Sequence, residues 1–222
     1  MSNLDVLQAS LEQALLAERL LDDLDCEDSF LDFFKQGWHA VEPGVELHVP
    51  WSLEVICEHL QAVSEGQIRR LLINVPPGFS KSMTTNVFWP AWEWGPRQLA
   101  HHRFISAAHE QGLSIRDMVR CRDLINSEWY AERWGDVFQF KGDANAKVEY
   151  HNTETGWRKA SSTGSGLTGY RGDRIILDDP HAVRDLESEA EREDALRWFS
   201  ETLPTRLNKP AESAIVVIMQ RI

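Results

Sequence analysis

Apolar residues follow two different spacings along the chain, and the change between them marks the predicted elements. Near the N-terminus leucines recur every three or four residues, as on one face of an amphipathic helix: Leu4, Leu7, Leu11 and Leu15. After Pro50 the same spacing predicts a second helix, with apolar positions at Leu53, Ile56, Cys57, Leu60 and Val63. We therefore expect an N-terminal helical extension over residues 1–45 and a folded core over residues 46–222.

Short apolar runs of strand length follow, separated by helical patterns. The predicted strands cover residues 71–75, 104–107, 175–177 and 214–219, and a hairpin is predicted over 147–160. Helical patterns fall at about 81–92, around 115–125, and after Ser188. Because strands alternate with helices, we expect an α/β fold, a three-layer sandwich with a mostly parallel central sheet.

Composition narrows the class of protein. The chain carries 35 Asp and Glu against 23 Lys and Arg, a net charge of −12, which disfavours a protein that coats nucleic acid nonspecifically but leaves room for a local basic groove. The chain has neither an apolar run of membrane-spanning length nor a secretory pattern at its start. The three scattered cysteines match no disulfide or metal motif. We expect a soluble, acidic, intracellular protein without a membrane partner.

The strongest chemical signal joins a predicted strand to a predicted helix. Residues 71–82 read LLINVPPGFSKS, a strand, a tight turn, and Lys81–Ser82 at the start of a helix. Backbone N–H groups and the positive end of the helix dipole favour phosphate at such a turn. In a phosphate loop the lysine reaches the β- and γ-phosphates of ATP, and the serine hydroxyl coordinates Mg²⁺.

The remaining loop positions fit the usual phosphate-loop motif imperfectly. Gly78, Phe79 and Ser80 complete the predicted nucleotide-binding segment, but Val75 and Ser80 stand where the motif has glycine. Serine at that position narrows the backbone freedom of the loop. An ordinary strand-to-helix turn is the alternative interpretation.

Two carboxylates end another apolar strand. Asp178 and Asp179 follow residues 175–177, and polar groups at the carboxyl ends of parallel strands lie where α/β proteins bind ligands. In phosphate-loop NTPases the strand next to the loop ends in an aspartate that holds Mg²⁺, so we assign Asp178 as metal ligand and Asp179 as general base. The alternative is that these residues only cap the turn at Pro180.

Other candidate residues are less specific. Gln220 and Arg221 follow the last predicted strand and are candidates to sense the γ-phosphate. Arg116 and Arg120, one helical turn apart, are candidates to reach a neighbouring subunit's nucleotide. The alternative is that they form ion pairs with nearby acidic residues such as Asp117. Trp51 is a candidate to flank an adenine ring.

In order along the chain, these motifs resemble the large terminase subunits of tailed bacteriophages. The resemblance runs from about residue 30 to the end, and its segments are Trp51, 56–60, Gly66, 68–77, 81–82, 127–130, 134–136, 178–181, 203–207 and 218–221. It implies an ATP-driven DNA-packaging motor whose N-terminal ATPase domain has a RecA-like P-loop NTPase fold. It also implies the roles above for Lys81, Ser82, Asp178 and Asp179, and a coupling role for Gln220 and Arg221.

The resemblance further implies partners and limits. The expected partners are double-stranded viral DNA, a portal protein and the small terminase subunit, with the motor working as a homo-oligomeric ring in the cytoplasm of the infected host. The acidic cluster of a terminase nuclease would lie beyond Ile222, so no nuclease activity is expected from these residues. Two alternatives stay open: a helicase-like DNA translocase, and a nucleotide-responsive assembly module with negligible turnover.

Overall fold

One seven-stranded sheet forms the centre of the structure, in the order β1-β7-β6-β2-β5-β4-β3. The computed structural model describes residues 3–165, 167–181 and 188–220. Strands β1, β7, β6, β2 and β5 are parallel, and β4 and β3 continue the sheet antiparallel. The strand bounds are β1 Arg70–Asn74, β2 Arg103–Ala108, β3 Phe140–Asn145, β4 Glu149–Asn152, β5 Trp157–Ser162, β6 Arg174–Asp178 and β7 Ala214–Met219.

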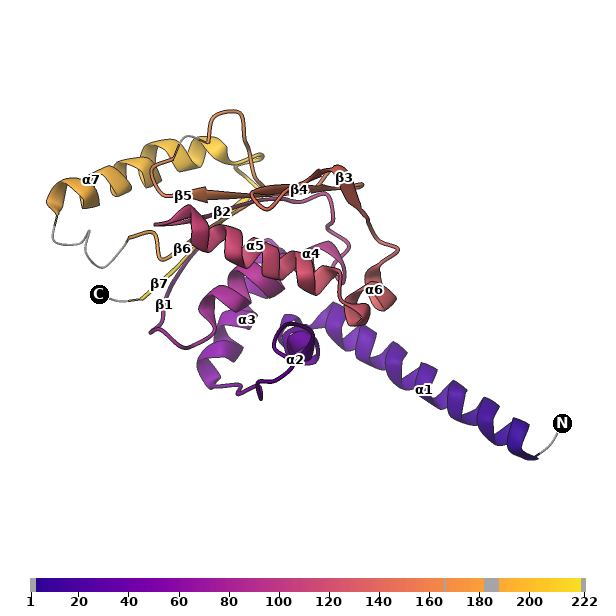
Figure 1. Ribbon diagram of the computed structural model, residues 1–222. Helices are drawn as coiled ribbons and strands as arrows, with labels where there is room; N and C mark the ends of the chain where they lie inside the picture. Colours follow the sequence, from indigo (N-terminus) through magenta and orange to yellow (C-terminus); the bar gives the residue numbers. More distant parts are fainter. Residues whose placement is uncertain (1–2, 166, 182–187, 221–222) are drawn as a thin grey trace.

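Helices cover both faces of this sheet (Figure 1). The larger core lies between the sheet and the helices α2 to α6, and the smaller one lies on the opposite face, under the segment that follows α7. The helical bounds are α1 Asn3–Asp28, α2 Phe30–Val41, α3 Trp51–Ser64, η1 Met83–Phe88, α4 Trp89–Trp94, α5 Gln111–Ile125, α6 Glu128–Trp134, α7 Glu189–Arg197, η3 Trp198–Thr202 and η4 Leu203–Arg206. The prediction of a three-layer α/β fold with a mostly parallel sheet is confirmed.

The strand order corrects one expectation. The strand that ends in Asp178 does not lie next to the strand before the candidate loop, because β7 lies between them and pairs with both. Val216 faces Leu71 on one side and Ile176 on the other. The run AIVVIM of β7 is continuously apolar, and a central parallel strand buries such a run on both of its faces.

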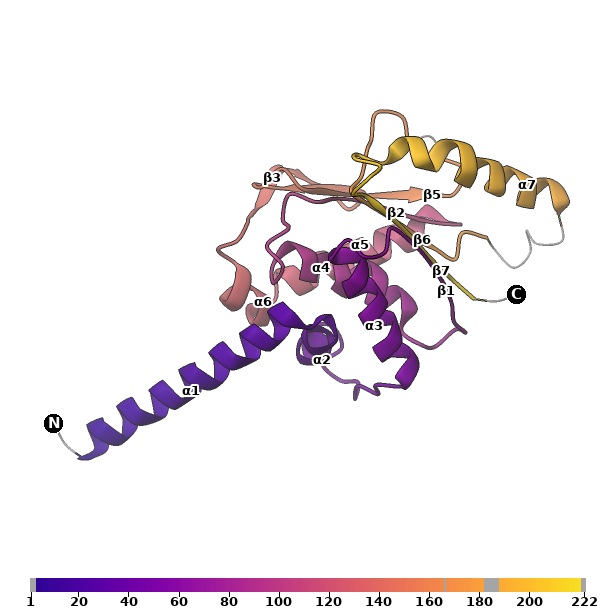
Figure 2. The same cartoon turned by 180° about the vertical axis from the view of Figure 1, so that it is seen from behind.

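The N-terminal helix α1 extends away from the body in both views (Figures 1 and 2). Six of its leucines are between 54% and 63% exposed: Leu11, Leu15, Leu16, Leu20, Leu21 and Leu24. Its C-terminal end joins the core, where Cys26 is buried and its carbonyl accepts a 2.7 Å bond from Trp92 Nε1. None of the described helices combines the length and apolarity that a bilayer crossing requires.

Helix α2 is built into the main core. Phe30, Phe33 and Phe34 on one of its faces are fully buried, and Phe34 contacts Phe88 with ring centroids 4.4 Å apart. Ser29 caps the helix by accepting a 3.1 Å bond from the Asp32 N–H. The predicted division at residue 45 therefore separates segments that share one apolar core, and the division stays a prediction.

A buried charge cluster ties the main helical layer to the sheet. Glu93 of α4 is fully buried, and its carboxylate accepts bonds from Arg174 Nε (2.8 Å), the Ser64 hydroxyl (2.7 Å) and, at 2.7 Å, the His102 ring. Burial by itself raises the pKa of Glu93, but Arg174 and His102 outweigh it and hold the pKa at about 2. The charged form is thus the stable form in the folded protein.

We predict that this cluster makes stability acid-sensitive. A carboxyl group whose pKa falls from 4.5 to about 2 on folding contributes stability above pH 4.5, and loses it as the pH falls toward 2. The full contribution is about 3 kcal/mol. Urea unfolding at pH 6 and pH 3.5 should show a smaller acid loss in Glu93→Gln than in wild type. Exposed Glu58→Gln is the control, and an equal acid loss in all three proteins would contradict this account.

Candidate phosphate-binding site

The loop between β1 and η1 is a tight turn with an uncommon backbone conformation. Gly78 lies at φ +86° and Ser80 at φ +54°, so two residues of the turn adopt the left-handed region. The Ser80 carbonyl accepts 2.9 Å bonds from both the N–H and the hydroxyl of Thr84. The Thr85 hydroxyl donates to the Lys81 carbonyl in the same way. The loop is therefore held by the first turn that follows it.

That first turn is not the α-helix the sequence predicts. Residues Met83–Phe88 form a π-helix, and the α-helix α4 begins only at Trp89. The wider turn places Asn86 inward, where it is 2% exposed, and Asn86 Nδ2 donates a 3.2 Å bond to Asp178 Oδ2. A π-helical turn often marks a functional site.

Lys81 and Asp179 form an ion pair across the sheet edge. The Lys81 side chain is 10% exposed and that of Asp179 is 26% exposed. An ammonium group this buried needs a nearby anion to offset its lost hydration. The pairing brings the two strand ends together over 98 residues of sequence, as their positions at the carboxyl edge of a parallel sheet require.

Asp179 itself is held in an unfavourable conformation. Its φ of +42° lies in the left-handed region, which costs a residue with a Cβ about 1–2 kcal/mol. Four further hydrogen bonds fix it. The Asp179 N–H donates to Ile218 O (2.9 Å), and Oδ1 accepts from the Gln220 N–H (3.0 Å). The Asp179 carbonyl bonds the N–H (3.2 Å) and ring Nδ1 (3.0 Å) of His109.

Asp178 faces Asn86 of η1 and is 7% exposed. Burial raises its pKa to about 6, opposed by the Ser82 hydroxyl and reinforced by Asp117 and Asp179. Its Oδ1 is buried without a hydrogen-bond partner. A carboxylate oxygen in this state, beside a serine hydroxyl, fits a hard divalent cation such as Mg²⁺, which would favour the charged form. Among the described residues there is no cluster of three or more His, Cys, Asp or Glu suited to a metal.

An open cleft of about 560 Å³ lies over the loop. Its floor includes Gly78, Ser80, Lys81, Ser82, Asp179 and Gln220, so the structure brings these predicted residues together. Its opposite wall comes from the end of α2 and the segment after it, with Trp38, Glu42 and Val45. Trp51 is 76% exposed and does not line the cleft, and Phe79 is 37% exposed beside it.

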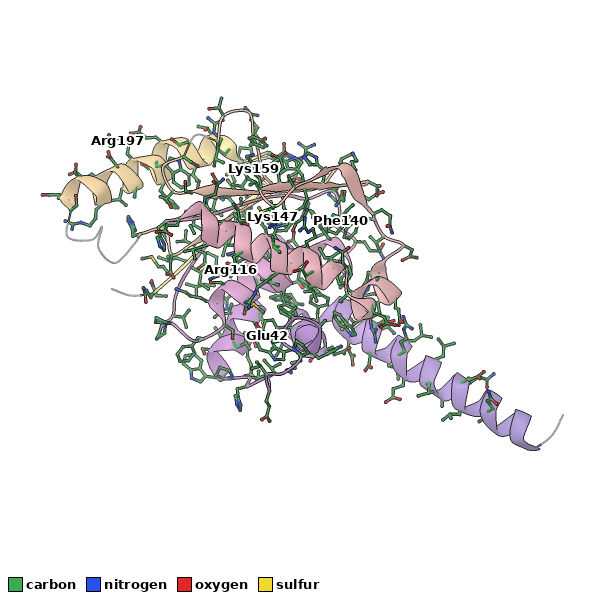
Figure 3. The ribbon with its side chains drawn as sticks, in the orientation of Figure 1. Glu42, Arg116, Phe140, Lys147, Lys159 and Arg197 are labelled. Atoms are coloured by element: carbon green, nitrogen blue, oxygen red, sulfur yellow. The ribbon has the colours of Figure 1, made fainter. Side chains whose placement is uncertain are left out.

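The two candidate arginines of α5 are engaged within the chain. Arg116 donates to both carboxylate oxygens of Asp117, at 2.8 and 3.2 Å. Arg120 forms a 3.0 Å ion pair with Glu42 and also contacts the sulfur of Met83. Figure 3 shows Arg116 on α5 and Glu42 at the end of α2. A role for either arginine in a neighbouring subunit stays a prediction. Arg221 lies outside the described residues.

Three residues at this site carry no motif in the sequence. Asn86 reaches Asp178 only because the turn is π-helical, and His109 reaches Asp179 only because β2 ends beside β6. Trp38 reaches the cleft because α2 packs against the helices that follow it. The usable signal is weak: Asn86 and His109 are polar residues that lie within or just after segments predicted to be regular and apolar.

The fold and the site define an α/β protein with an open cleft at the carboxyl ends of its parallel strands. No family model matches the chain, and no curated protein matches its sequence. Over most of its length the chain is similar in structure to large terminases. The HK97 bacteriophage large terminase aligns with TM-score 0.46 and 12% identity, over 87% of this chain and 37% of that one. The large terminase of a thermophilic bacteriophage aligns with TM-score 0.40 and 11% identity, over 79% and 39%. The chain thus spans well under half the length of either.

We predict different effects on stability from two substitutions in the loop. The Cβ added by Gly78→Ala would have no atom within 4 Å, so no clash is expected. The strain of a side chain at positive φ should still lower the free energy of unfolding by about 1 kcal/mol. Ser80→Gly relieves the same kind of strain and should not lower stability. Gly112→Ala, in helix α5 with equally open space and no positive φ, is the control and should be neutral or stabilising. The free energy of unfolding of each variant is measured by chemical denaturation. A Gly78→Ala protein as stable as Gly112→Ala would contradict the assigned loop conformation.

Proposed function

We propose that this chain is a Mg²⁺-dependent ATPase, the motor part of a large terminase that drives viral DNA into a prohead. The observation that carries the proposal is the ion pair of Lys81 with Asp179, at a cleft whose floor is a left-handed turn leading into a helix. The ordered terminase-like motifs of the sequence support the same class of motor.

The loop supplies the groups that bind phosphate. The turn leads into the N-terminal end of a helical segment, where backbone N–H groups favour an anion, and Lys81 adds a nearly buried positive charge. In the structure that charge is compensated by Asp179. Phosphate oxygens of bound ATP are an alternative anion for Lys81, so nucleotide binding would free one oxygen of Asp179.

Ser82 and Asp178 would hold Mg²⁺, with Asn86 orienting the aspartate through its 3.2 Å bond. When bound, the ion neutralises charge on the phosphates. Asp179, once released from Lys81, would accept a proton from the attacking water as general base. Its left-handed backbone, anchored by His109 and Ile218, sets the direction in which that carboxylate points.

Strand β7 offers a route by which the site would be coupled to movement. It lies between β1 and β6, and the Gln220 N–H at its end bonds Asp179 Oδ1. Loss of the γ-phosphate would return Lys81 to Asp179. The Asp179 carboxylate would then shift, and with it the geometry of its hydrogen bond to the Gln220 N–H. We assign Gln220 to coupling on that ground, and Arg221 by sequence resemblance alone.

The partners follow from the proposed class of motor. We propose double-stranded viral DNA, a portal protein and the small terminase subunit as partners, with a homo-oligomeric ring on the portal as the working assembly. The place of action would be the cytoplasm of the infected host. Arg116 or Arg120 would act on a neighbouring subunit's nucleotide only after leaving its present carboxylate partner.

One observation favours a second function, a nucleotide-responsive assembly module with negligible turnover. Both oxygens of Asp179 are engaged in the structure, one by Lys81 and one by the Gln220 N–H. Hydrolysis with Asp179 as base would therefore require a ligand to displace Lys81 from one of these oxygens. An ATP-dependent change of stability without hydrolysis would be the behaviour of such a module.

We predict that Asp179→Asn keeps Mg·ATP binding and loses most hydrolysis. Removing a general base costs about 10²–10⁴-fold in rate. Phosphate release, measured with and without duplex DNA, reports hydrolysis, and calorimetric titration reports binding. Asp136→Asn, at a site remote from the cleft, is the matched control. Equal turnover in wild type and Asp179→Asn would remove Asp179 from the mechanism, and binding without turnover in wild type would favour the assembly module.

A further inference from the structure

A second groove, of about 480 Å³, lies at the amino ends of β2 and β5. The cleft over Lys81, called the phosphate cleft below, lies at the carboxyl ends of the parallel strands. Arg103 and Trp157, the first residues of β2 and β5, form part of its wall. Other parts of the wall come from the segment before β6, with Tyr170 and Arg171, from the end of η4, with Arg206, and from β4. Three arginines from three separate segments therefore line one groove.

None of these three arginines has a carboxylate partner within 4.0 Å among the described residues. Elsewhere in this acidic chain arginines such as Arg133 and Arg174 are paired with Asp23 and Glu93. The Arg206 side chain donates a 3.4 Å bond to the Leu167 carbonyl, and its Nε is buried without a partner. A buried donor without a partner is unfavourable, so the groove holds positive charge that the fold itself does not use.

The carboxylate that lines the groove, Glu149, is already neutralised. Glu149 accepts 2.8 Å bonds from Lys159 Nζ and the Tyr170 hydroxyl, and the His151 ring lies at the same distance. Lys159 also lies over the Tyr170 ring, 4.0 Å from its centroid, and Figure 3 shows it on the side of the sheet where α7 lies. The net charge of the groove is therefore positive although that of the chain is −12.

Backbone hydrogen bonds fix the segments that carry the arginines. The Gly172 N–H donates to Arg206 O at 2.8 Å, and the Asp173 N–H donates to Arg103 O at 2.8 Å. A Cβ on Gly172 would lie 3.2 Å from that same Arg103 carbonyl, so glycine permits the close approach. The backbones of the three arginines are thus fixed relative to one another before any ligand binds, which lowers the entropic cost of binding.

The geometry points to this groove as a binding site for the phosphate backbone of double-stranded DNA. The choice of DNA as the polyanion rests on the proposed function. Arginine forks match phosphate oxygens, and Trp157 and Tyr170, with ring centroids 5.5 Å apart, give the groove a firm aromatic wall. Arg171 is exposed and the groove is open, so a single small anion would be bound weakly through screened charges. A polymer that contacts all three arginines gains from counterion release at each.

The test measures binding of a fluorescent DNA duplex by anisotropy over a range of KCl concentrations. Three phosphate contacts predict a slope of about −3 for log K against log salt, and each lost contact removes about 1. Arg103→Gln with Arg171→Gln should therefore lower the affinity at low salt and leave a slope of about −1. Arg19→Gln is the control: it removes the same type of charge from the projecting helix α1, with a partly exposed ion pair to Glu132 and a bond to the Glu132 carbonyl.

Three outcomes decide the proposal. Loss of affinity and slope in the double variant, but not in Arg19→Gln, supports it. Unchanged binding in the double variant, or competition by inorganic phosphate as effective as that by duplex at equal phosphate concentration, overturns it. Because the groove is separate from the phosphate cleft, Lys81→Ala should bind duplex normally without nucleotide. DNA binding and ATP hydrolysis can therefore fail independently.

Discussion

A nearly buried ammonium group is the constraint on which the site depends. Lys81 has little access to water, so an anion must lie beside it, and Asp179 supplies that anion from a strand end 98 residues away. The pair fixes the loop after β1 relative to the end of β6. The fold itself thus provides the negative charge that the nearly buried Lys81 needs.

The same pair explains how a strained residue persists. Asp179 adopts a left-handed backbone that favours glycine, and it does so because its N–H, its carbonyl and both carboxylate oxygens are all engaged. The partners of Asp179 come from the ends of β2 and β7 and from the loop after β1. A movement of Asp179 would therefore alter hydrogen bonds to all three of these segments. His109 is the least expected of these partners, since it contacts Asp179 through both its backbone and its ring. We regard it as a positioning residue.

Sequence reasoning succeeded where a single segment carries the signal. The apolar run of β7 predicted its bounds, residues 214–219, and the two strand ends with Lys81 and Asp178–Asp179 were expected to meet at one sheet edge. It failed where contacts depend on packing between distant segments. The position of β7 between β1 and β6 and the π-helical turn that aims Asn86 both follow from tertiary packing. The arginine groove shows the same limit, because Arg103, Arg171 and Arg206 meet only in the folded chain.

The most direct test of the account is the effect of Mg·ATP on the thermal midpoint of unfolding in wild type and in Lys81→Ala. Ligand binding to the folded state alone raises the midpoint, by an amount set by ligand concentration over Kd. The account predicts a clear rise in wild type and none in Lys81→Ala, because the variant lacks the charge that pairs with phosphate. An equal rise in both proteins would contradict the assignment of this cleft as the nucleotide site.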